Sequence, residues 1–289
     1  MMLNLLVTGA NGFVGQRFMQ YNAKRYNLVP VSLRNIKPQD VDLTGIDTIV
    51  HLAGKAHDMQ LKDEKVYFDI NYELTKALAE HAVKSGIKHF IYISSVKVYG
   101  EGSDDEVLNE ASPCKPEDPY GASKLKAEQF VESLPITVSI VRPPVVYGPG
   151  VKGNIIRLLK AVDQGKPLPL GKTGNQRTMV FLDNLIELIN RVIDTQTPGI
   201  FVPADAAPLS TDGLIQLMGS ALNKKTKLIA VPGFMRKLIS IAKPKLYKRL
   251  FGSFVINNSS TNQRLNFSPP YSTEQGIQKM ISWYNEQHL

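Results

Sequence analysis

Three side chains near the middle of the sequence are suited to moving a proton to or from a hydroxyl group. Tyr120 and Lys124 lie four residues apart in PYGASK, at the start of a predicted helix, so their side chains should share one helix face. Ser95 ends an apolar run that precedes them. A tyrosine hydroxyl has a pKa of about 10, and a nearby ammonium together with a cationic nicotinamide ring would favour its phenolate form. The trio predicts Tyr120 as a general acid/base that Lys124 tunes, with Ser95 holding the substrate oxygen.

A glycine-rich loop near the N-terminus predicts where a dinucleotide would bind. Residues 8–15 read TGANGFVG and place Gly9, Gly12 and Gly15 between the first predicted strand and the first predicted helix. Gly9 allows a tight turn, Gly12 lets the backbone approach a pyrophosphate, and Gly15 lets the helix pack on the strand. Ser95, Tyr120 and Lys124 would each suit a surface position if taken singly, but behind such a loop they predict a catalytic site.

The residues after the second predicted strand bear on which dinucleotide binds. An acidic residue there would hydrogen-bond the ribose of NAD, whereas a basic residue accommodates the additional phosphate of NADP. The sequence has Arg34 at this place and no acid before Asp40. Arg34 slightly favours NADP, although an arginine at a strand end is often only a solvated cap.

An alternation of strands and helices must position these residues. Near-continuous apolar runs predict strands at 3–8, 28–33, 47–53, 89–94 and 137–142, and helices are expected at about 12–23, 71–85 and 120–133. Strands of this kind are typical of a parallel sheet that helices cover on both faces. The sequence predicts an α/β fold with a doubly wound, Rossmann-like parallel sheet.

After Tyr147 the pattern changes and indicates a smaller, mixed C-terminal substrate lobe. Pro and Gly cluster around a predicted helix at 154–164, and the runs at 178–181 and 199–203 are expected to return to the main sheet. We assign residues 1–148, with about 178–203, to an NAD(P)-binding Rossmann domain. Residues 149–177, with about 204–289, are assigned to the substrate-binding lobe.

Composition narrows the class of protein. Hydrophobic residues make up 43% and charged residues 21%, which excludes a disordered or fibrous chain. The single cysteine, Cys114, excludes an internal disulfide and suits a reducing compartment. Without a run of about 18 apolar residues or a signal-peptide pattern, a cytoplasmic protein is expected. The histidines show no metal-ligand spacing, so no metal site is predicted.

Positive charge gathers in the C-terminal part. The net charge is +8, and residues 213–273 contain no Asp or Glu. A solvated basic face beside an anionic substrate is the plainer interpretation. The stretch lacks an aromatic ladder for stacking bases, so no nucleic-acid partner is predicted. Phe234, Leu238 and Ile241 recur on one helix face, which is usual for the buried side of a lobe helix but also fits weak peripheral contact with an anionic bilayer.

The chain resembles an extended short-chain dehydrogenase/reductase of the nucleotide-sugar epimerase/dehydratase family in the order and spacing of five motifs: TGANGFVG, HLAG, SSVKVYG, PYGASK and RPPVVYGPG. The resemblance implies that Lys124 also holds the nicotinamide ribose and that Asn71 supports the active-site strand. The residues implied to bind NAD(P) are Gly9, Asn11, Gly12, Phe13, Val14, Gly15, Arg34, Asp42, Leu43, Leu52, Ala53, Gly54, Lys55, Asn71, Tyr120, Lys124 and Pro143. Those implied to bind the nucleotide sugar are Ser95, Lys97, Asn154 and Arg177, and Arg177 would suit a surface salt bridge equally well. A homodimer through the helices at 71–85 and 120–133 is also implied.

Members of this family transfer hydride at a sugar carbon, usually C4. Dehydratases carry Asp-Glu directly after the serine position, where this chain has Val96-Lys97, so dehydration is disfavoured. SSVKVYGE most resembles the UDP-sugar 4-epimerases and 4-ketoreductases of bacterial surface-polysaccharide synthesis. We expect NAD(P)-dependent hydride transfer at C4 of a UDP-sugar, of the UDP-glucose/UDP-N-acetylglucosamine 4-epimerase type. The alternatives are an NADPH-dependent 4-ketoreductase of a UDP-2-acetamido-dideoxy-4-ketohexose and a non-catalytic dinucleotide-binding regulator; an epimerase would use NAD.

Overall fold

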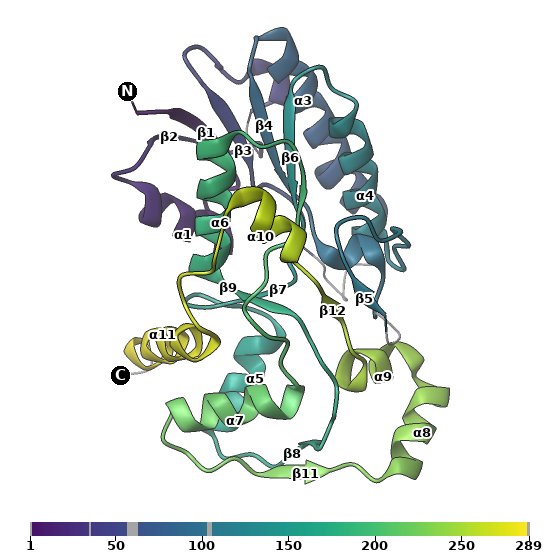
Figure 1. Cartoon of the computed structure of the whole chain (residues 1–289). Helices are drawn as coiled ribbons and strands as arrows, with labels where there is room; N and C mark the ends of the chain where they lie inside the picture. The colour runs from purple at the N-terminus through teal and green to yellow at the C-terminus, as the bar shows by residue number, and fades with distance from the viewer. Residues whose placement is uncertain (1, 35, 57–62, 103–105, 288–289) are drawn as a thin grey trace.

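Six parallel strands form the central sheet, in the order β10-β6-β4-β3-β1-β2 (Figure 1). The computed structural model describes residues 2–34, 36–56, 63–102 and 106–287. The strands are β1 (Asn4–Thr8), β2 (Asn27–Val31), β3 (Thr48–His51), β4 (His89–Ile93), β6 (Thr137–Val141) and β10 (Gly199–Phe201). The chain runs from β1 to β2 at one edge and then returns to β3 on the other side of β1. This reversal confirms the predicted doubly wound sheet and marks the point where such sheets bind ligands.

Helices cover both faces of the sheet because successive strand residues point to opposite sides. Leu5 and Val7 enter a core with α1 and α6, whereas Leu6 enters a second core with α3 and α4. The helices are α1 (Phe13–Asn22), α3 (Leu74–Lys84), α4 (Pro119–Glu132) and α6 (Leu182–Thr195). Burial on both sides explains why the inner strands are continuous apolar runs. The edge strand β2 is more exposed and contains Pro30, which an edge tolerates.

The helix before β4 begins earlier than predicted and is not regular. It consists of α2 (Lys65–Phe68), a π-helical turn η2 (Asp69–Glu73) and α3, in place of one helix over 71–85. A π turn changes the direction of the side chains within it and often occurs at functional sites. Asn71 is buried in this turn.

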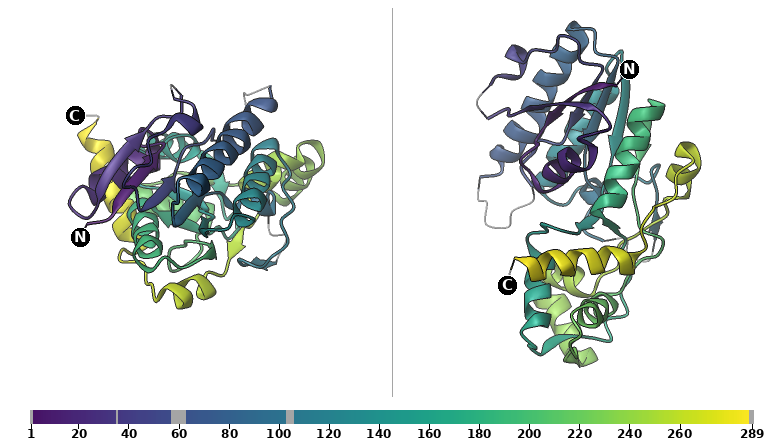
Figure 2. Two further views of the ribbon diagram at one scale, coloured as in Figure 1. Left: turned by 90° about the horizontal axis from the view of Figure 1, so that it is seen from above. Right: turned by 90° about the vertical axis from the view of Figure 1, so that its left-hand side faces the viewer.

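A smaller lobe occupies the lower half of Figure 1 and of the right-hand view in Figure 2. Its parallel strand pairs are β7 (Val145–Tyr147) with β9 (Met179–Phe181), β8 (Leu168–Gly171) with β11 (Leu228–Ala230), and β5 (Val107–Leu108) with β12 (Val255–Ile256). Its helices are α5 (Asn154–Asp163), α7 (Thr211–Ala221), α8 (Gly233–Ala242), α9 (Pro244–Phe251) and α11 (Thr273–Glu286). Two short 3₁₀ turns of the described chain adjoin strands of the central sheet: η1 (Pro38–Asp40) precedes β3, and η3 (Val96–Tyr99) follows β4. Within the described part of the chain, no helix is long and apolar enough to cross a membrane.

Two segments lie elsewhere than the sequence predicted. Residues 199–203 supply β10 to the main sheet, but the prediction that 178–181 also return to it is wrong, since β9 pairs with β7. Two prolines, Pro143 and Pro144, follow β6 and cannot donate backbone hydrogen bonds, so the chain leaves the sheet before β7 forms. Helix α10 (Ser259–Leu265), which we assigned to the second lobe, lies beside α6, and its Leu265 enters the first lobe's core.

A buried ion pair fixes α4 to the end of β6. Arg142 Nη2 lies 2.6 Å from Glu128 Oε2, and the two side chains are 4% and 1% exposed. Arg142 Nη1 also donates to the Tyr99 hydroxyl. Removing one partner of such a pair leaves an uncompensated buried charge.

We therefore expect Glu128→Gln to lower the free energy of unfolding by about 3–5 kcal/mol, measured by urea denaturation. Glu80→Gln is the matched control, because Glu80 lies 4.0 Å from Lys76 on the solvent side of α3. That variant should change stability by less than about 1 kcal/mol. Equal losses in the two variants would show that the buried pair contributes no more to the free energy of unfolding than the exposed one.

Candidate active site

The predicted trio meets at the carboxyl end of β4. Ser95 follows this strand by two residues, and its Oγ accepts a hydrogen bond from the Lys97 amide at the start of η3. Tyr120 and Lys124 lie in the first turns of α4, which Asp118 caps by accepting from the Gly121 amide at 2.7 Å. A Cβ on Gly121 would lie 2.6 Å from the Lys97 carbonyl oxygen, so only glycine lets α4 approach η3 this closely.

Tyr120 is held beside Ser95 in surroundings that favour its neutral form. Desolvation is the main cause that raises the pKa of Tyr120, to about 12, and the charge of Asp118 adds to the effect. A hydrogen bond with the Ser95 hydroxyl acts in the opposite direction. The ring of Tyr67 packs edge-on against that of Tyr120, with the ring centroids 6.0 Å apart. The chain's own groups therefore keep Tyr120 protonated at neutral pH.

Lys124 is buried, and its ammonium is tied to β4. Its Nζ donates to the Ile93 carbonyl oxygen at 2.8 Å and lies 4.7 Å from the centre of the Tyr92 ring. Burial lowers the pKa of Lys124 to about 8, and Glu128, one helical turn further on, partly opposes this shift. The ammonium form still predominates at neutral pH.

Within the protein alone, desolvation of the phenol outweighs the influences that lower the pKa of Tyr120, so the predicted phenolate also needs the nicotinamide. A cationic nicotinamide ring would add the charge that favours the phenolate.

The glycine loop forms a close turn against β3 and opens directly into α1. Gly9 has a φ of +72°, and a Cβ there would lie 2.6 Å from the Ala53 amide nitrogen. A Cβ on Gly15 would lie 2.1 Å from the Gly9 carbonyl oxygen. Gly12, the N-cap of α1, offers no side-chain cap to the first amides of the helix. These features fit a dinucleotide pyrophosphate, which Gly9, Gly12 and the Phe13–Val14 backbone would hold.

Asn71 joins the segment after β3 to α4. Its Oδ1 accepts from the Lys55 amide at 2.7 Å, and its Nδ2 donates to the Lys55 carbonyl and to Ser123 Oγ. A Cβ on Gly54 would lie 3.0 Å from Asn71 Oδ1 and 3.3 Å from Lys124 Nζ. Asn71 is therefore a positioning residue that packs residues 52–55 of the predicted cofactor groove against Lys124.

Two buried residues next to Lys124, His51 and Tyr92, were not predicted to belong to the site. His51 bonds through Nδ1 to Thr8 Oγ1 and through Nε2 to Thr75 Oγ1, and its ring stacks on Tyr92. Burial, helped by the charge of Lys124, lowers the pKa of His51 to about 3, so the ring is neutral. A histidine and a tyrosine inside continuous apolar strands were the available signal, since buried polar groups need partners.

The NAD-dependent epimerase/dehydratase family matches this chain over residues 5–202. The chain belongs to that family. It is 32% identical to a UDP-glucose 4-epimerase of Vibrio cholerae, with 96% of this chain and 94% of the relative aligned. It is 25% identical to an N-acetyl-alpha-D-glucosaminyl-diphospho-ditrans,octacis-undecaprenol 4-epimerase of Escherichia coli O157:H7. That alignment covers 97% of this chain and 95% of the relative. Its fold matches that of a UDP-glucuronic acid 4-epimerase of Bacillus cereus solved with NAD, with a TM-score of 0.81 and 21% identity. The match covers 99% of this chain and 100% of the solved one.

Family membership confirms the predicted NAD(P)-dependent nucleotide-sugar enzyme class. The nicotinamide of a dinucleotide held at this site would supply the hydride-transfer chemistry. Tyr120 can take or give the proton of the reacting sugar hydroxyl, Ser95 can hold that oxygen, and Lys124 supplies positive charge below them.

The other predicted residues of this epimerase/dehydratase lie as follows. Arg34 is exposed just after β2, Asn11 and Asp42 are exposed, and Leu43 is buried in the core beside α3. The Pro143 carbonyl accepts from the Val96 amide. Lys97 Nζ lies 2.6 Å from Glu101 Oε2. Asn154 is the first residue of α5. Arg177 donates to the Lys248 and Gly252 carbonyls near the end of α9. Asn154 and Arg177 therefore belong to the smaller lobe, whereas the trio lies at the central sheet.

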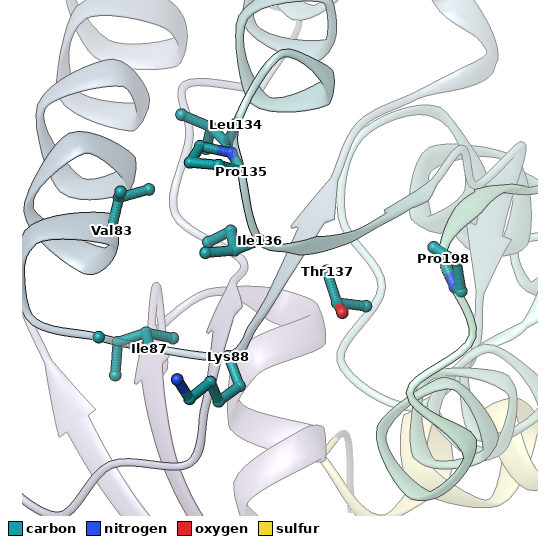
Figure 3. A pocket seen from close by; sticks show the side chains of 9 residues that line it. Val83, Ile87, Lys88, Leu134, Pro135, Ile136, Thr137 and Pro198 are labelled. Atoms are coloured by element: carbon teal, nitrogen blue, oxygen red, sulfur yellow. The ribbon is translucent and has the colours of Figure 1, made fainter.

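A cavity of about 730 Å³ lies at the other end of the sheet (Figure 3). Lys88 and Pro198, which line it, directly precede β4 and β10, and Thr137, also in its lining, is the first residue of β6. It is therefore at the amino ends of the strands, whereas doubly wound sheets bind ligands at the carboxyl ends. Within the residues that the structure describes, no group of three His, Cys, Asp or Glu side chains could hold a metal.

Replacing Tyr120 by Phe should lower turnover of the enzyme's nucleotide-sugar substrate by about 10²–10⁴, because the proton carrier is lost. Dinucleotide affinity should change only a few-fold, as measured by fluorescence titration. Tyr67→Phe is the matched control, since it removes the hydroxyl of the ring packed on Tyr120. A similar loss of turnover in both variants would contradict the assignment of the acid/base to Tyr120.

Lys124 also makes stability depend on pH. Between about pH 8 and 10.5 the folded protein has released a proton that the unfolded chain retains, so the free energy of unfolding should rise with pH in this window. Relative to Lys124→Gln, the wild type should gain roughly 2 kcal/mol between pH 8 and 10 in urea denaturation without dinucleotide. Parallel pH profiles for the two proteins would mean that Lys124 titrates normally.

Proposed function

We propose that the protein is an NAD-dependent UDP-hexose 4-epimerase. The observation that carries this proposal is the end-to-end likeness to the UDP-glucose 4-epimerase of Vibrio cholerae. The geometry supports it, because the glycine loop and the Ser95–Tyr120 pair lie at the same edge of the sheet. An epimerase returns its hydride in every cycle, so it gains nothing from the separate NADPH pool.

The reaction needs one general base that later serves as the acid. As the phenolate that a cationic nicotinamide would favour, Tyr120 would take the proton of the C4 hydroxyl, and the nicotinamide would accept the C4 hydride to leave a 4-keto sugar. The 4-keto sugar would then turn its other face towards the nicotinamide. The hydride would return to C4, and Tyr120 would give the proton back to the C4 oxygen. No net oxidation occurs, and the Ser95 hydroxyl would hydrogen-bond the C4 oxygen throughout.

A dehydratase is a poorer fit to the same site. Elimination of water needs a second acid/base pair, and the two positions after Ser95 hold Val96 and Lys97. Val96 is buried in an apolar cluster, and the Lys97 ammonium pairs with Glu101. Neither residue supplies a carboxyl group to the sugar.

The substrate diphosphate would be held from the second lobe. We assign this role to Asn154 and Arg177, because a guanidinium can bind two phosphate oxygens at once. Arg177 already donates to two carbonyls near the end of α9, which would fix its fork in place. Lys97, whose amide donates to Ser95 Oγ, is assigned to the sugar end of the substrate.

Two measurements on the freshly purified protein test this proposal. Acid-denatured protein should release NAD⁺, and incubation with UDP-glucose should produce UDP-galactose without added cofactor, followed by proton NMR. UDP-N-acetylglucosamine should be tried in parallel, since the relatives differ in this substituent. Gly15→Ala should abolish both retention and turnover, because its Cβ would meet the Gly9 carbonyl oxygen.

Other outcomes separate the alternatives. Stoichiometric consumption of NADPH with a 4-keto sugar and no epimerisation would identify a 4-ketoreductase and would give Arg34 its predicted role. Dinucleotide binding without turnover of any nucleotide sugar would favour a regulator. Either result would contradict the proposed epimerase.

A further inference from the structure

Helix α8 presents large apolar side chains to solvent. Phe234, Leu238 and Ile241 are 74%, 69% and 73% exposed, and no residue of α8 is buried. Their spacing of four and three residues puts them on one face of the helix. The sequence pattern alone favoured burial of this stripe in the lobe, and the structure shows the opposite.

The other face of α8 is anchored, so the exposed stripe is held outward. Arg236 lies on that face and donates to the Val231, Gly171 and Lys172 carbonyls. Its guanidinium also lies 5.0 Å from the centre of the Phe251 ring on α9. Turning the apolar face into the lobe would break all of these contacts.

The charge around α8 identifies what kind of surface suits it. Residues 213–273 contain no Asp or Glu, and two exposed lysines lie on α8 and directly after it, at Lys237 and Lys243. In a symmetric contact between two copies, this acid-free segment would face itself and its lysines would repel. A surface with negative charge above an apolar layer complements both features, as an anionic lipid bilayer does.

We propose that α8 docks the protein on an anionic membrane surface, with Phe234, Leu238 and Ile241 inserted at the level of the headgroups. Lys237 and Lys243 contact the lipid phosphates. The helices expected to form a dimer, α3 and α4, belong to the other lobe, so docking through α8 leaves them accessible (Figure 1).

Contacts through α9 connect the docking helix to the candidate active site. The α9 helix packs against α8, and Lys248 Nζ lies 3.5 Å from Glu117 Oε1, three residues before Tyr120. Arg177 bonds to the carbonyl of the same Lys248. The docking helix is therefore connected to the substrate side of the site, although the inference does not depend on which sugar is turned over.

Co-sedimentation of the full chain with vesicles tests the proposal. Binding is expected to vesicles that mix phosphatidylglycerol with phosphatidylcholine, and it should weaken at moderate salt and be at least tenfold weaker with phosphatidylcholine alone. The triple variant Phe234→Ser/Leu238→Ser/Ile241→Ser should reduce binding at least tenfold at an unchanged melting temperature. Val29→Ser, which removes an exposed apolar residue from β2, is the matched control and should bind normally.

Three results would overturn the proposal. The first is no sedimentation with either vesicle at low and moderate salt. The second is equal binding by the wild type and the triple variant. The third is an oligomer of the wild type in light scattering that the triple variant cannot form, which would show that a second copy covers α8.

Discussion

The buried ammonium of Lys124 is the constraint on which the site depends. A cation taken out of water must find partners within the protein, and Lys124 finds the Ile93 carbonyl and the face of Tyr92. Ile93 ends β4, and Ser95 follows two residues later. The contact that satisfies the lysine therefore also fixes α4 at the strand end and brings Tyr120 next to Ser95. The lowered pKa of Lys124 reflects the cost of this burial.

The surrounding packing makes that arrangement rigid from three sides. Gly121 allows α4 to approach η3, and Asn71 holds the segment after β3 against α4. On the far side, Glu128 pairs with Arg142 at the end of β6. Because Glu128 also favours the charged form of Lys124, one carboxylate serves both the stability of the helix and the electrostatics of the site.

Local patterns in the sequence were enough to predict the strands of the sheet, the glycine loop and the Tyr120–Lys124 pair, because each is formed by residues close together in the chain. Ser95 could be added because parallel strands bring their carboxyl ends to one edge of the sheet. The π turn that directs Asn71, the neutral state of His51 and the high pKa of Tyr120 depend on burial by distant segments, which no local pattern reports. The pairing of β9 with β7 had a local signal that the prediction did not use, the two prolines at which the chain leaves the sheet. The stripe on α8 has the sequence pattern of a buried helix face, but its side chains are exposed. The hydrogen bonds of Arg236 on the opposite face explain this orientation, and they are made to residues distant in the sequence.

We propose that Ser95, Tyr120 and Lys124 support reversible removal of a hydride, and not a proton, from C4 of the sugar. Conversion of UDP-glucose that carries deuterium at C4, followed by NMR and mass spectrometry in ordinary water, tests it most directly. The UDP-galactose formed should keep the deuterium at C4, because the hydride returns without exchanging with solvent. Product that carries hydrogen at C4 would contradict it.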